Sequence, residues 1–296
     1  MGGQTRGSLQ IGSRVLDWGS RTYLMGVINV SPESFSGDGL KAPATALKQA
    51  RRFADEGADI LDVGGQSTRP GFDEISVAEE IRRVVPAIER IAGGVDLPVS
   101  VDTYRAEVAK AALDAGASMI NDIWGFRHDP ALAVLCARRD VPAVVMHNQR
   151  GREFDDVIGD ITAGLGECIK IASRAGVAKE SLILDPGFGF GWTPEQNLEM
   201  LRRLAELRAL GRPLLIGTSR KSTIGMVLDK PEDQRLFGTA ASVALAIANG
   251  ADIVRVHDVA QMSEVARMTD AIVRGWHKAD SQPAGSGPET RQGSRG

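Results

Sequence analysis

A glycine-rich stretch near residue 65 brings two hydroxyls and a guanidinium together. Ser67, Thr68 and Arg69 follow Gly64-Gly65 and precede Pro70-Gly71. The glycines widen the choice of backbone conformations and the proline removes a hydrogen-bond donor, so this stretch is expected to form a loop. Hydroxyl and guanidinium donors suit an anion. A solvated turn with an incidental arginine is the commoner fate of such a loop, so the rest of the chain has to decide between the two readings.

Residues with similar chemistry recur along the chain, each at the end of an apolar run. Taken alone, an Asp or Asn in such a place is usually a cap or a turn former. Their recurrence after run upon run indicates one shared site instead. The residues are Asn29, Asp102 with Thr103, Asn121 with Asp122, Met146 with His147, Asp185, Ser219-Arg220-Lys221, and Arg255 with His257 and Asp258.

The elements that would position these residues repeat eight times. In each repeat an apolar, strand-forming run precedes a polar loop and a segment of helical periodicity. Such alternation predicts an α/β fold, and eight repeats favour a closed (β/α)8 TIM barrel with its catalytic residues at the carboxyl ends of the strands. An open doubly wound sheet is the alternative, but no Gly-x-Gly-x-x-Gly follows the first strand. The runs span 23–30, 58–65, 98–103, 118–125, 142–147, 181–187, 213–219 and 251–258, and the helices include 44–56, 77–91, 105–115, 194–210 and 261–274.

The two ends of the chain differ from the repeats. Residues 8–18 alternate around Gly12-Ser13, which predicts a β-hairpin, and this hairpin is expected to plug the barrel floor. Residues 1–7 and 277–296 are small and polar and are expected to be disordered, which leaves 8–276 as a single barrel domain.

The composition describes an ordinary globular protein. The chain has 296 residues, of which 43% are hydrophobic, and a net charge of −3, so nothing supports binding to nucleic acid or to a membrane. Cys136 and Cys168 match no metal or redox spacing. The sequence shows neither a signal peptide nor a membrane-spanning stretch, and a cytoplasmic location is expected.

One half of the expected site has the chemistry of an anion pocket. Arg69, Arg255 and His257 are donors, and Asn29 is a neutral oxygen ligand of the kind that Mg²⁺ accepts beside phosphate oxygens. Together they predict a pocket for a group of the size of a diphosphate.

The other half suits a flat heterocycle with several N–H donors. It consists of Asp102, Asn121 and Asp185, with Lys221 pointing in. Paired carboxylates could instead serve general acid–base hydrolysis. Their partners here are an amide and an amine rather than a second acid, so recognition is favoured.

Seven motifs, in this order, resemble the dihydropteroate synthase family of the folate pathway, and the resemblance spans residues 23–275. It implies that the amine of 4-aminobenzoate displaces diphosphate from 6-hydroxymethyl-7,8-dihydropterin diphosphate and forms 7,8-dihydropteroate. It also implies Mg²⁺ as cofactor, a cytoplasmic homodimer and a sulfonamide target. The motifs are MGVINVSPESFS (25–36), DVGGQSTRPG (62–71), SVDT (100–103), IND (120–122), LDPGFGF (184–190), SRKS (219–222) and RVHD (255–258).

The resemblance also implies a role for individual residues. Arg69, Asp102, Lys221, Arg255 and His257 would carry catalysis. Among the positions that match the family, the pterin would be held by Asp102, Asn121, Asp185 and Lys221, and its faces would pack against Met146 and Arg255. Mg²⁺ would contact Asn29, and the diphosphate would be surrounded by Arg69, Arg255 and His257. The 4-aminobenzoate pocket would be shaped by Thr68, Phe190, Lys221 and Ser222.

Some positions depart from the family's usual pattern. Gln66 replaces a glutamate, Trp192 replaces a lysine, the acid of the first loop moves by one position to Asp38, and 122–125 reads Asp-Ile-Trp-Gly. We expect these changes to affect loop closure and affinity for 4-aminobenzoate rather than the reaction class.

Two alternative functions are considered. A pterin-dependent methyltransferase has no diphosphate to neutralise, so the Ser-Thr-Arg-Pro-Gly loop and the 219–222 segment argue against it. A pterin-binding paralogue with weak or no synthase activity would be expected to lack Arg69, Asp102, Lys221 or Arg255, and all four are present. Because Arg255 would serve both substrate groups, Arg255→Ala is expected to cost activity more than stability.

Overall fold

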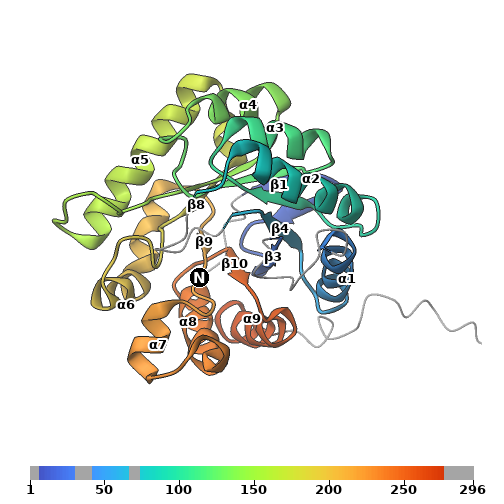
Figure 1. Ribbon diagram of the computed structural model, residues 1–296. Coiled ribbons are helices and arrows are strands. Elements are labelled where there is room, and N and C mark those ends of the chain that lie inside the picture. Colours follow the sequence, from blue (N-terminus) through green and yellow to red (C-terminus); the bar gives the residue numbers. More distant parts are fainter. Residues whose placement is uncertain (1–6, 31–41, 67–73, 277–296) are drawn as a thin grey trace, which may run out of the picture.

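Eight parallel strands form the centre of the molecule, and helices surround them (Figure 1). The computed structural model describes residues 7–30, 42–66 and 74–276. The strands pair in the order β8-β7-β6-β5-β4-β3-β10-β9. They are β3 (Tyr23–Asn29), β4 (Ile60–Gly64), β5 (Val99–Asp102), β6 (Met119–Asp122), β7 (Ala143–Met146), β8 (Leu182–Asp185), β9 (Leu215–Ile216) and β10 (Ile253–Val256).

The barrel is closed. A parallel bridge joins Leu184 of β8 to Leu214, the residue before β9, and the backbone N–H of Leu184 donates to the carbonyl of Pro213 at 2.9 Å. The first and last strands of the sheet therefore meet. The predicted (β/α)8 barrel is confirmed, and the open sheet is excluded.

Helices follow the strands around the barrel (Figure 1). Capping side chains mark several starts: Ser76 accepts from the N–H of Glu79, and Thr193 forms a reciprocal capping box with Gln196. The helices are α1 (Ala42–Asp55), α2 (Val77–Ala92), α3 (Ala106–Asp114), α4 (Ala131–Arg139), α5 (Val157–Ala175), α6 (Pro194–Arg203), α7 (Ser222–Leu228), α8 (Leu236–Ala248) and α9 (Val259–Arg274), with 3-10 turns η1 (Lys179–Ser181), η2 (Leu204–Leu210) and η3 (Glu232–Gln234).

Glycines end four of these helical segments, as the sequence predicts. Gly57, Gly116, Gly176 and Gly250 all have φ between 88° and 110°, in the left-handed region that stops a helix. One predicted helix is divided: the segment expected over 194–210 is α-helical to Arg203 and continues as the 3-10 turn η2. No helix in the described ranges is long and apolar enough to cross a membrane.

A separate hairpin covers the floor of the barrel. Strands β1 (Ser8–Ile11) and β2 (Arg14–Asp17) pair antiparallel around Gly12-Ser13. Its apolar side chains pack in one buried cluster with residues that begin the barrel strands, which confirms the predicted plug. The cluster consists of Leu9, Ile11, Leu16, Trp18, Tyr23, Met25, Ile60, Met119, Val144, Ile183, Leu215 and Ile253.

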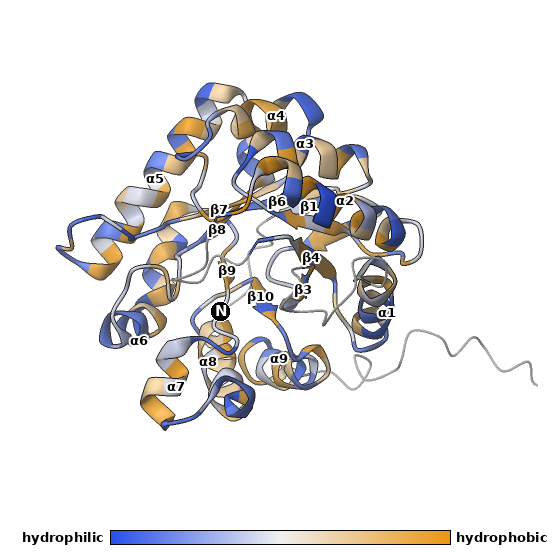
Figure 2. Cartoon of the chain, viewed as in Figure 1, coloured by the Kyte–Doolittle hydropathy of each residue, from blue (hydrophilic) through white to orange (hydrophobic). Residues whose placement is uncertain are grey.

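The inward side chains change character along the strands. Side chains of a strand point to alternate faces, so a residue two positions later faces the same side. On this face the apolar floor layer, which comprises Ile60, Met119, Val144, Ile183 and Ile253, is followed two residues later by Asp62, Asn121, Met146, Asp185 and Arg255. These five residues and Asp102, which ends β5 and contacts Arg255, form the upper layer, and all of them except Met146 are polar. Figure 2 shows the contrast between the apolar strands and the mixed surfaces of the helices around them.

Candidate active site

Arg255 lies at the centre of the upper layer, between two carboxylates. Its Nε donates to Asp62 Oδ2 at 2.7 Å, and its Nη2 donates to Asp102 Oδ2 at 2.7 Å. Burial opposes the charge on Arg255, but the carboxylates of Asp62 and Asp102 raise its pKa above the ordinary value. The guanidinium is therefore charged and is held in place from two sides.

Asp62 is the residue of this group that the sequence analysis did not single out. Its side chain is completely buried, and Oδ2 accepts a second hydrogen bond, from Asn121 Nδ2 at 3.0 Å. Its other oxygen, Oδ1, is buried without a hydrogen-bond partner among the described residues. The feature of the sequence that could have identified Asp62 is its position on β4, two residues after the floor residue Ile60.

The carboxyl groups of Asp102 and Asp185 are poorly solvated. Burial raises the pKa of Asp185 to about 6, although Gly187 donates its N–H to Oδ1 at 2.7 Å. Burial also raises the pKa of Asp102 to about 7; Arg255 opposes this rise and Asp62 adds to it. Carboxylates that have lost water gain most from N–H donors supplied by a ligand.

Lys221 is a partly buried cation beside these acids. Burial, and next the charge of Arg255, lower its pKa to about 8, whereas Asp185 acts in the opposite direction. Its Nζ lies 4.2 Å from the centroid of the Phe190 ring. The Phe190 ring also lies 4.8 Å from the guanidinium carbon of Arg150. The Phe190 ring therefore lies in cation–π contact with two positively charged side chains, Lys221 and Arg150.

An apolar wall borders the polar layer. Tyr104, Ile123, Met146 and Phe190 form a buried cluster, and the partly buried Trp124 packs against it. Together, these side chains can contact the faces of a flat ring while the carboxylates meet its edge. Sequence reasoning assigned Met146 and Phe190 to the site but missed Tyr104 and Ile123, because an apolar residue after a strand gives no chemical signal of its own.

A polar cavity opens between α1 and the start of α9. Its volume is ≈ 370 Å³. Of the residues predicted for the anion pocket, Asn29 and His257 line this cavity and Arg255 does not. The ring Nδ1 of His257 lies 3.1 Å from Ser219 Oγ. The remaining lining residues include Arg52, Glu56, Arg220, Asp258 and Gln261.

The structure brings most of the predicted site residues together. Met146, Asn121 and Asp185 are buried, and Asp102, Lys221 and Arg255 are partly buried around the same space. Ser222 is exposed at the first position of α7. Thr68, Arg69 and Asp38 lie outside the described residues, so their assignments stay predictions.

Two residues of the predicted rim have structural contacts instead. The carboxylate of Asp122 accepts the backbone N–H groups of Trp124 at 2.8 Å and Phe126 at 2.6 Å, and so holds the turn after β6. His147 is completely buried, its Nε2 lies 2.8 Å from Gln149 Oε1, and burial lowers its pKa to about 4. Neither group reaches the upper layer.

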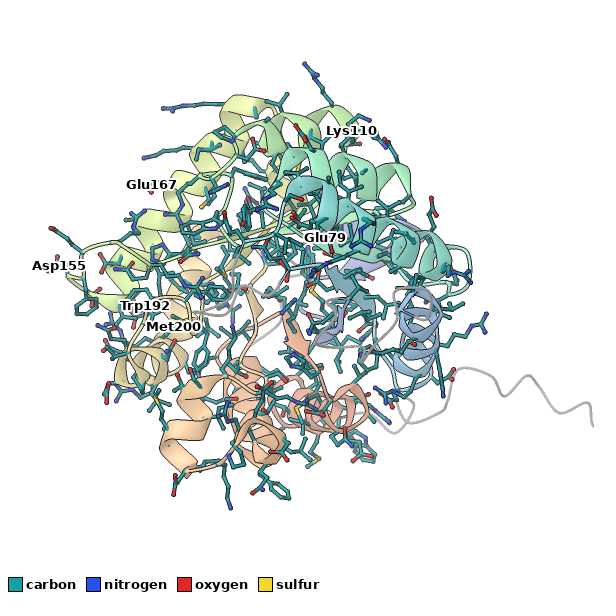
Figure 3. All side chains as sticks on the ribbon, in the orientation of Figure 1. Glu79, Lys110, Asp155, Glu167, Trp192 and Met200 are labelled. Carbon is teal, nitrogen blue, oxygen red and sulfur yellow. The ribbon has the colours of Figure 1, made fainter. Side chains whose placement is uncertain are left out.

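Trp192 is one of the departures from the family pattern. We expected this departure from the family pattern to bear on 4-aminobenzoate affinity. The structure instead buries Trp192 in the core between barrel and helices, with its ring 5.7 Å from His147 and 6.2 Å from Phe154. Trp192 and Met200, which are both labelled in Figure 3, belong to the same core cluster. The effect of Trp192 on 4-aminobenzoate affinity stays a prediction, and this core position leads us to expect that the effect is small.

Similar proteins place this arrangement in a known family. A family model described as pterin binding enzyme matches residues 25–257. A dihydropteroate synthase from Clostridium beijerinckii is 50% identical over 268 residues, which cover 90% of this chain and 100% of the relative. The chain belongs to the dihydropteroate synthase family. A family member from Bacillus subtilis is 48% identical and covers 87% of this chain and 91% of its own length.

Solved structures of the dihydropteroate synthase family share the fold. One from Clostridium difficile, determined in the presence of pteroic acid, has a TM-score of 0.85 and 48% identity and covers 88% of this chain and 99% of its own. A Xanthomonas albilineans dihydropteroate synthase with 4-aminobenzoic acid has a TM-score of 0.86 and 39% identity, with coverage of 95% and 100%. Membership of this family favours the synthase over the methyltransferase alternative.

Proposed function

We propose that this chain condenses 6-hydroxymethyl-7,8-dihydropterin diphosphate with 4-aminobenzoate to form 7,8-dihydropteroate and diphosphate. The observation that supports this most strongly is the upper layer of the barrel, where Arg255 is fixed between Asp62 and Asp102 beside further hydrogen-bond acceptors. A pterin presents several N–H groups on one edge of a flat ring, and this layer contains carboxylate and amide oxygens that can accept hydrogen bonds from them.

The pterin is proposed to lie in the upper layer with its donor edge toward Asp102, Asn121 and Asp185. Met146 and Arg255 would contact its two faces. Asp102 and Asp185 are costly to ionise without a ligand, because burial raises the pKa of both. Pterin N–H groups would offset that cost, so binding favours a ring with donors over one with acceptors.

The bond change needs no nucleophile from the protein. The amine nitrogen of 4-aminobenzoate forms a bond to the exocyclic methylene carbon of the pterin, and the carbon–oxygen bond to diphosphate breaks. The amine releases one proton, and diphosphate carries away the electron pair of the broken bond. The residues of the site contribute by holding both reactants close and by stabilising the departing charge.

The anion side is proposed to comprise Arg69, Arg255 and His257, with Asn29 as the contact for Mg²⁺. The described residues contain no cluster of three or more His, Cys, Asp or Glu side chains that could hold a metal. They fit an ion carried by the diphosphate better than one caged by protein, because Asn29 is an exposed neutral ligand and Mg²⁺ often binds through phosphates and water. Such an ion would neutralise charge on the leaving diphosphate.

The 4-aminobenzoate is proposed to lie between Phe190, Lys221 and Ser222, with Thr68 completing its pocket. Phe190 offers a ring face, and Lys221 offers a cation that suits a carboxylate. A dihydropteroate synthase from Yersinia pestis has been solved with a sulfonamide drug. We propose that sulfonamides compete for the same place in this chain.

We also propose a homodimer and a cytoplasmic location. Five large apolar side chains are exposed on the adjacent helices α7 and α8, and Phe237, at 84% exposure, is the most prominent. Apolar side chains gathered in this way suit an interface, here with a second copy of the chain. The patch consists of Met226, Val227, Leu228, Phe237 and Leu245. Phe237→Asp should convert the dimer to a monomer in sedimentation experiments, and cell fractionation tests the location.

The proposal is tested by assaying diphosphate release from the purified chain with Mg²⁺ and the pterin diphosphate, with and without 4-aminobenzoate. Release that depends on 4-aminobenzoate, with dihydropteroate as the product, is expected. Pterin binding without release would favour the paralogue that has lost synthase activity.

A further inference from the structure

Asp62 contacts two residues that face the proposed pterin space. Its Oδ2 accepts from Arg255 Nε at 2.7 Å and from Asn121 Nδ2 at 3.0 Å. One buried oxygen therefore joins β4 to β6 and β10 across the barrel. The Asp62 side chain is completely buried.

The contact with Asn121 determines which amide atom faces the ligand. An ionised carboxylate can only accept hydrogen bonds, and a side-chain amide can either donate or accept. Asp62 Oδ2 accepts from the Arg255 guanidinium, so the same oxygen meets the Asn121 amide as an acceptor. Asn121 must therefore turn its Nδ2 toward Asp62, and its Oδ1 becomes the group it can offer to a ligand.

The contact with Arg255 determines the orientation of the guanidinium. Asp102 holds Nη2 at 2.7 Å from a second direction. Two contacts on different nitrogens fix the plane of the group as well as its position. With Asp102 alone, the guanidinium could rotate about the single remaining contact.

We propose that Asp62 is a positioning residue for pterin recognition, which acts by presenting Asn121 as an acceptor and by fixing the plane of Arg255. This inference rests on the proposed function and adds to it a residue that acts through two others. It also explains why a carboxylate is buried directly above an apolar floor, where an uncharged side chain would pack at lower cost.

The direct test replaces Asp62 with asparagine, which keeps the shape and removes the charge. The KM for the pterin diphosphate should rise by about 10–100-fold, as for loss of a charged hydrogen bond, while the KM for 4-aminobenzoate changes by less than about twofold. The acid limb of the pH profile of kcat/KM should move to lower pH, because the charge of Asp62 helps to raise the pKa of Asp102.

Asp252→Asn is the matched control. Asp252 is another buried aspartate, at the opposite end of β10, where its Oδ2 accepts the backbone N–H of Leu214 at 3.0 Å. Both variants are expected to lower the melting temperature, but only Asp62→Asn should change pterin affinity and the acid limb. Equal effects of the two variants on pterin KM, or an unmoved acid limb in folded Asp62→Asn, would overturn the proposal.

A double variant covers the case in which Asp62→Asn does not fold. The combination of Asp62→Asn with Arg255→Gln removes both charges of this ion pair, so that neither is left buried without its partner. The double variant is compared with Arg255→Gln alone. If Asp62 acts largely through Arg255, adding Asp62→Asn should weaken binding of pteroic acid by less than about threefold further. A further loss as large as the roughly 10–100-fold expected for Asp62→Asn beside an intact Arg255 would show that Asp62 acts independently of Arg255 and would overturn the role assigned to that contact.

Equilibrium binding of pteroic acid separates this inference from the proposed function. Wild-type binding without turnover would contradict the synthase activity, and weaker binding by Asp62→Asn would still support the role of Asp62. Equal binding by wild type and folded Asp62→Asn would contradict the role of Asp62 alone. No binding by the wild type would overturn both.

Discussion

The floor and the upper layer of the barrel interior lie on the same strands, two residues apart, and differ in almost every physical property. Ile60 precedes Asp62, Ile183 precedes Asp185, and Ile253 precedes Arg255. The floor is apolar and is covered by the hairpin. The upper layer contains buried acids whose pKa values are raised and a guanidinium held between carboxylates.

The difference shows where this chain departs from what stability alone would select. Burying apolar side chains stabilises the fold, whereas burying charges usually costs free energy even when they are paired. Residues that break the local packing rule are therefore candidates for function. The apolar side chains of the floor stabilise the barrel, whereas the polar side chains of the upper layer, on the same strands, are the candidates for binding and catalysis.

The largest effect is expected from Arg255→Ala. Loss of the guanidinium should lower kcat/KM by about 100-fold or more, since it removes a fixed group from the reacting region. It should also lower the free energy of unfolding by about 3–5 kcal/mol, because Asp62 is left buried and uncompensated. The sequence alone led us to expect a cost mainly in activity, and the Asp62 contact changes that expectation. Steady-state kinetics and urea unfolding measure both effects, and normal turnover would contradict the assignment of Arg255.

A large effect on stability alone is expected from Ile60→Ala in the floor. The free energy of unfolding should fall by about 2–5 kcal/mol from lost burial and the cavity left behind. Kinetic constants of the folded fraction should stay within about twofold, as for sites without shared partners. Because Asp62 lies on the same strand, a large change in pterin KM would show that floor and upper layer are not separable. Ile60→Val, with a smaller cavity, serves as the control.

Asp185→Asn should separate activity from stability in the opposite way. The pterin KM should rise by about 10–100-fold, because a charged acceptor is lost. Stability at pH 8 should stay unchanged or increase, since the pKa of Asp185 is raised to about 6 and its ionised form is disfavoured by burial. The asparagine can still accept the N–H of Gly187. A marked fall in melting temperature would contradict this account of Asp185.

The pH dependence should show the ionisation of the upper layer. The kcat/KM for the pterin diphosphate should rise as Asp185 and then Asp102 ionise, near pKa values of about 6 and about 7, and fall as Lys221 loses its proton near about 8. Between about pH 4 and about pH 7, Asp185 and Asp102 hold more protons in the folded state than in the unfolded chain, because burial raises the pKa of both. Together they outweigh the buried His147, whose lowered pKa acts in the opposite direction. The free energy of unfolding should therefore decrease as pH rises through this range. Substrate ionisation is measured separately as the control, and a flat profile would contradict the assignment.

The smallest effect on activity is expected from Trp192→Phe. Trp192 packs in the core beside His147 and Phe154, outside the barrel interior. The KM for 4-aminobenzoate should change by less than about twofold, with a stability loss of about 1 kcal/mol that is typical of single changes. A clear change in the KM for 4-aminobenzoate would show that Trp192 does influence the 4-aminobenzoate pocket.

Much of the fold could be predicted because the sequence repeats its signals. Eight apolar runs and the glycines that end the preceding helices gave the strands within a few residues, and Gly12-Ser13 gave the hairpin. The polar residues at the strand ends likewise identified Asp102, Asn121, Asp185 and Arg255 as neighbours. These predictions depend on local patterns that survive in the folded protein.

The rest of the site depended on which way each side chain points, and the sequence of a closed barrel does not reveal this. Both faces of its strands are buried, so hydrophobicity does not show which residues point inward. Asp62 was therefore not singled out as a site residue, and the sequence did not show that Trp192 packs in the core. Asp122 resembled a site residue, although its carboxylate caps a turn. Register and side-chain direction, known only from the structure, distinguish these cases.

The most direct test of the account is a crystal structure of this protein with pteroic acid. We expect the pterin ring in the upper layer, between Met146 and Arg255, with its N–H groups toward Asp102, Asn121 and Asp185 and with Oδ1 of Asp62 close by. A pterin ring bound instead in the cavity between α1 and α9, with the upper layer unchanged, would contradict the central claim.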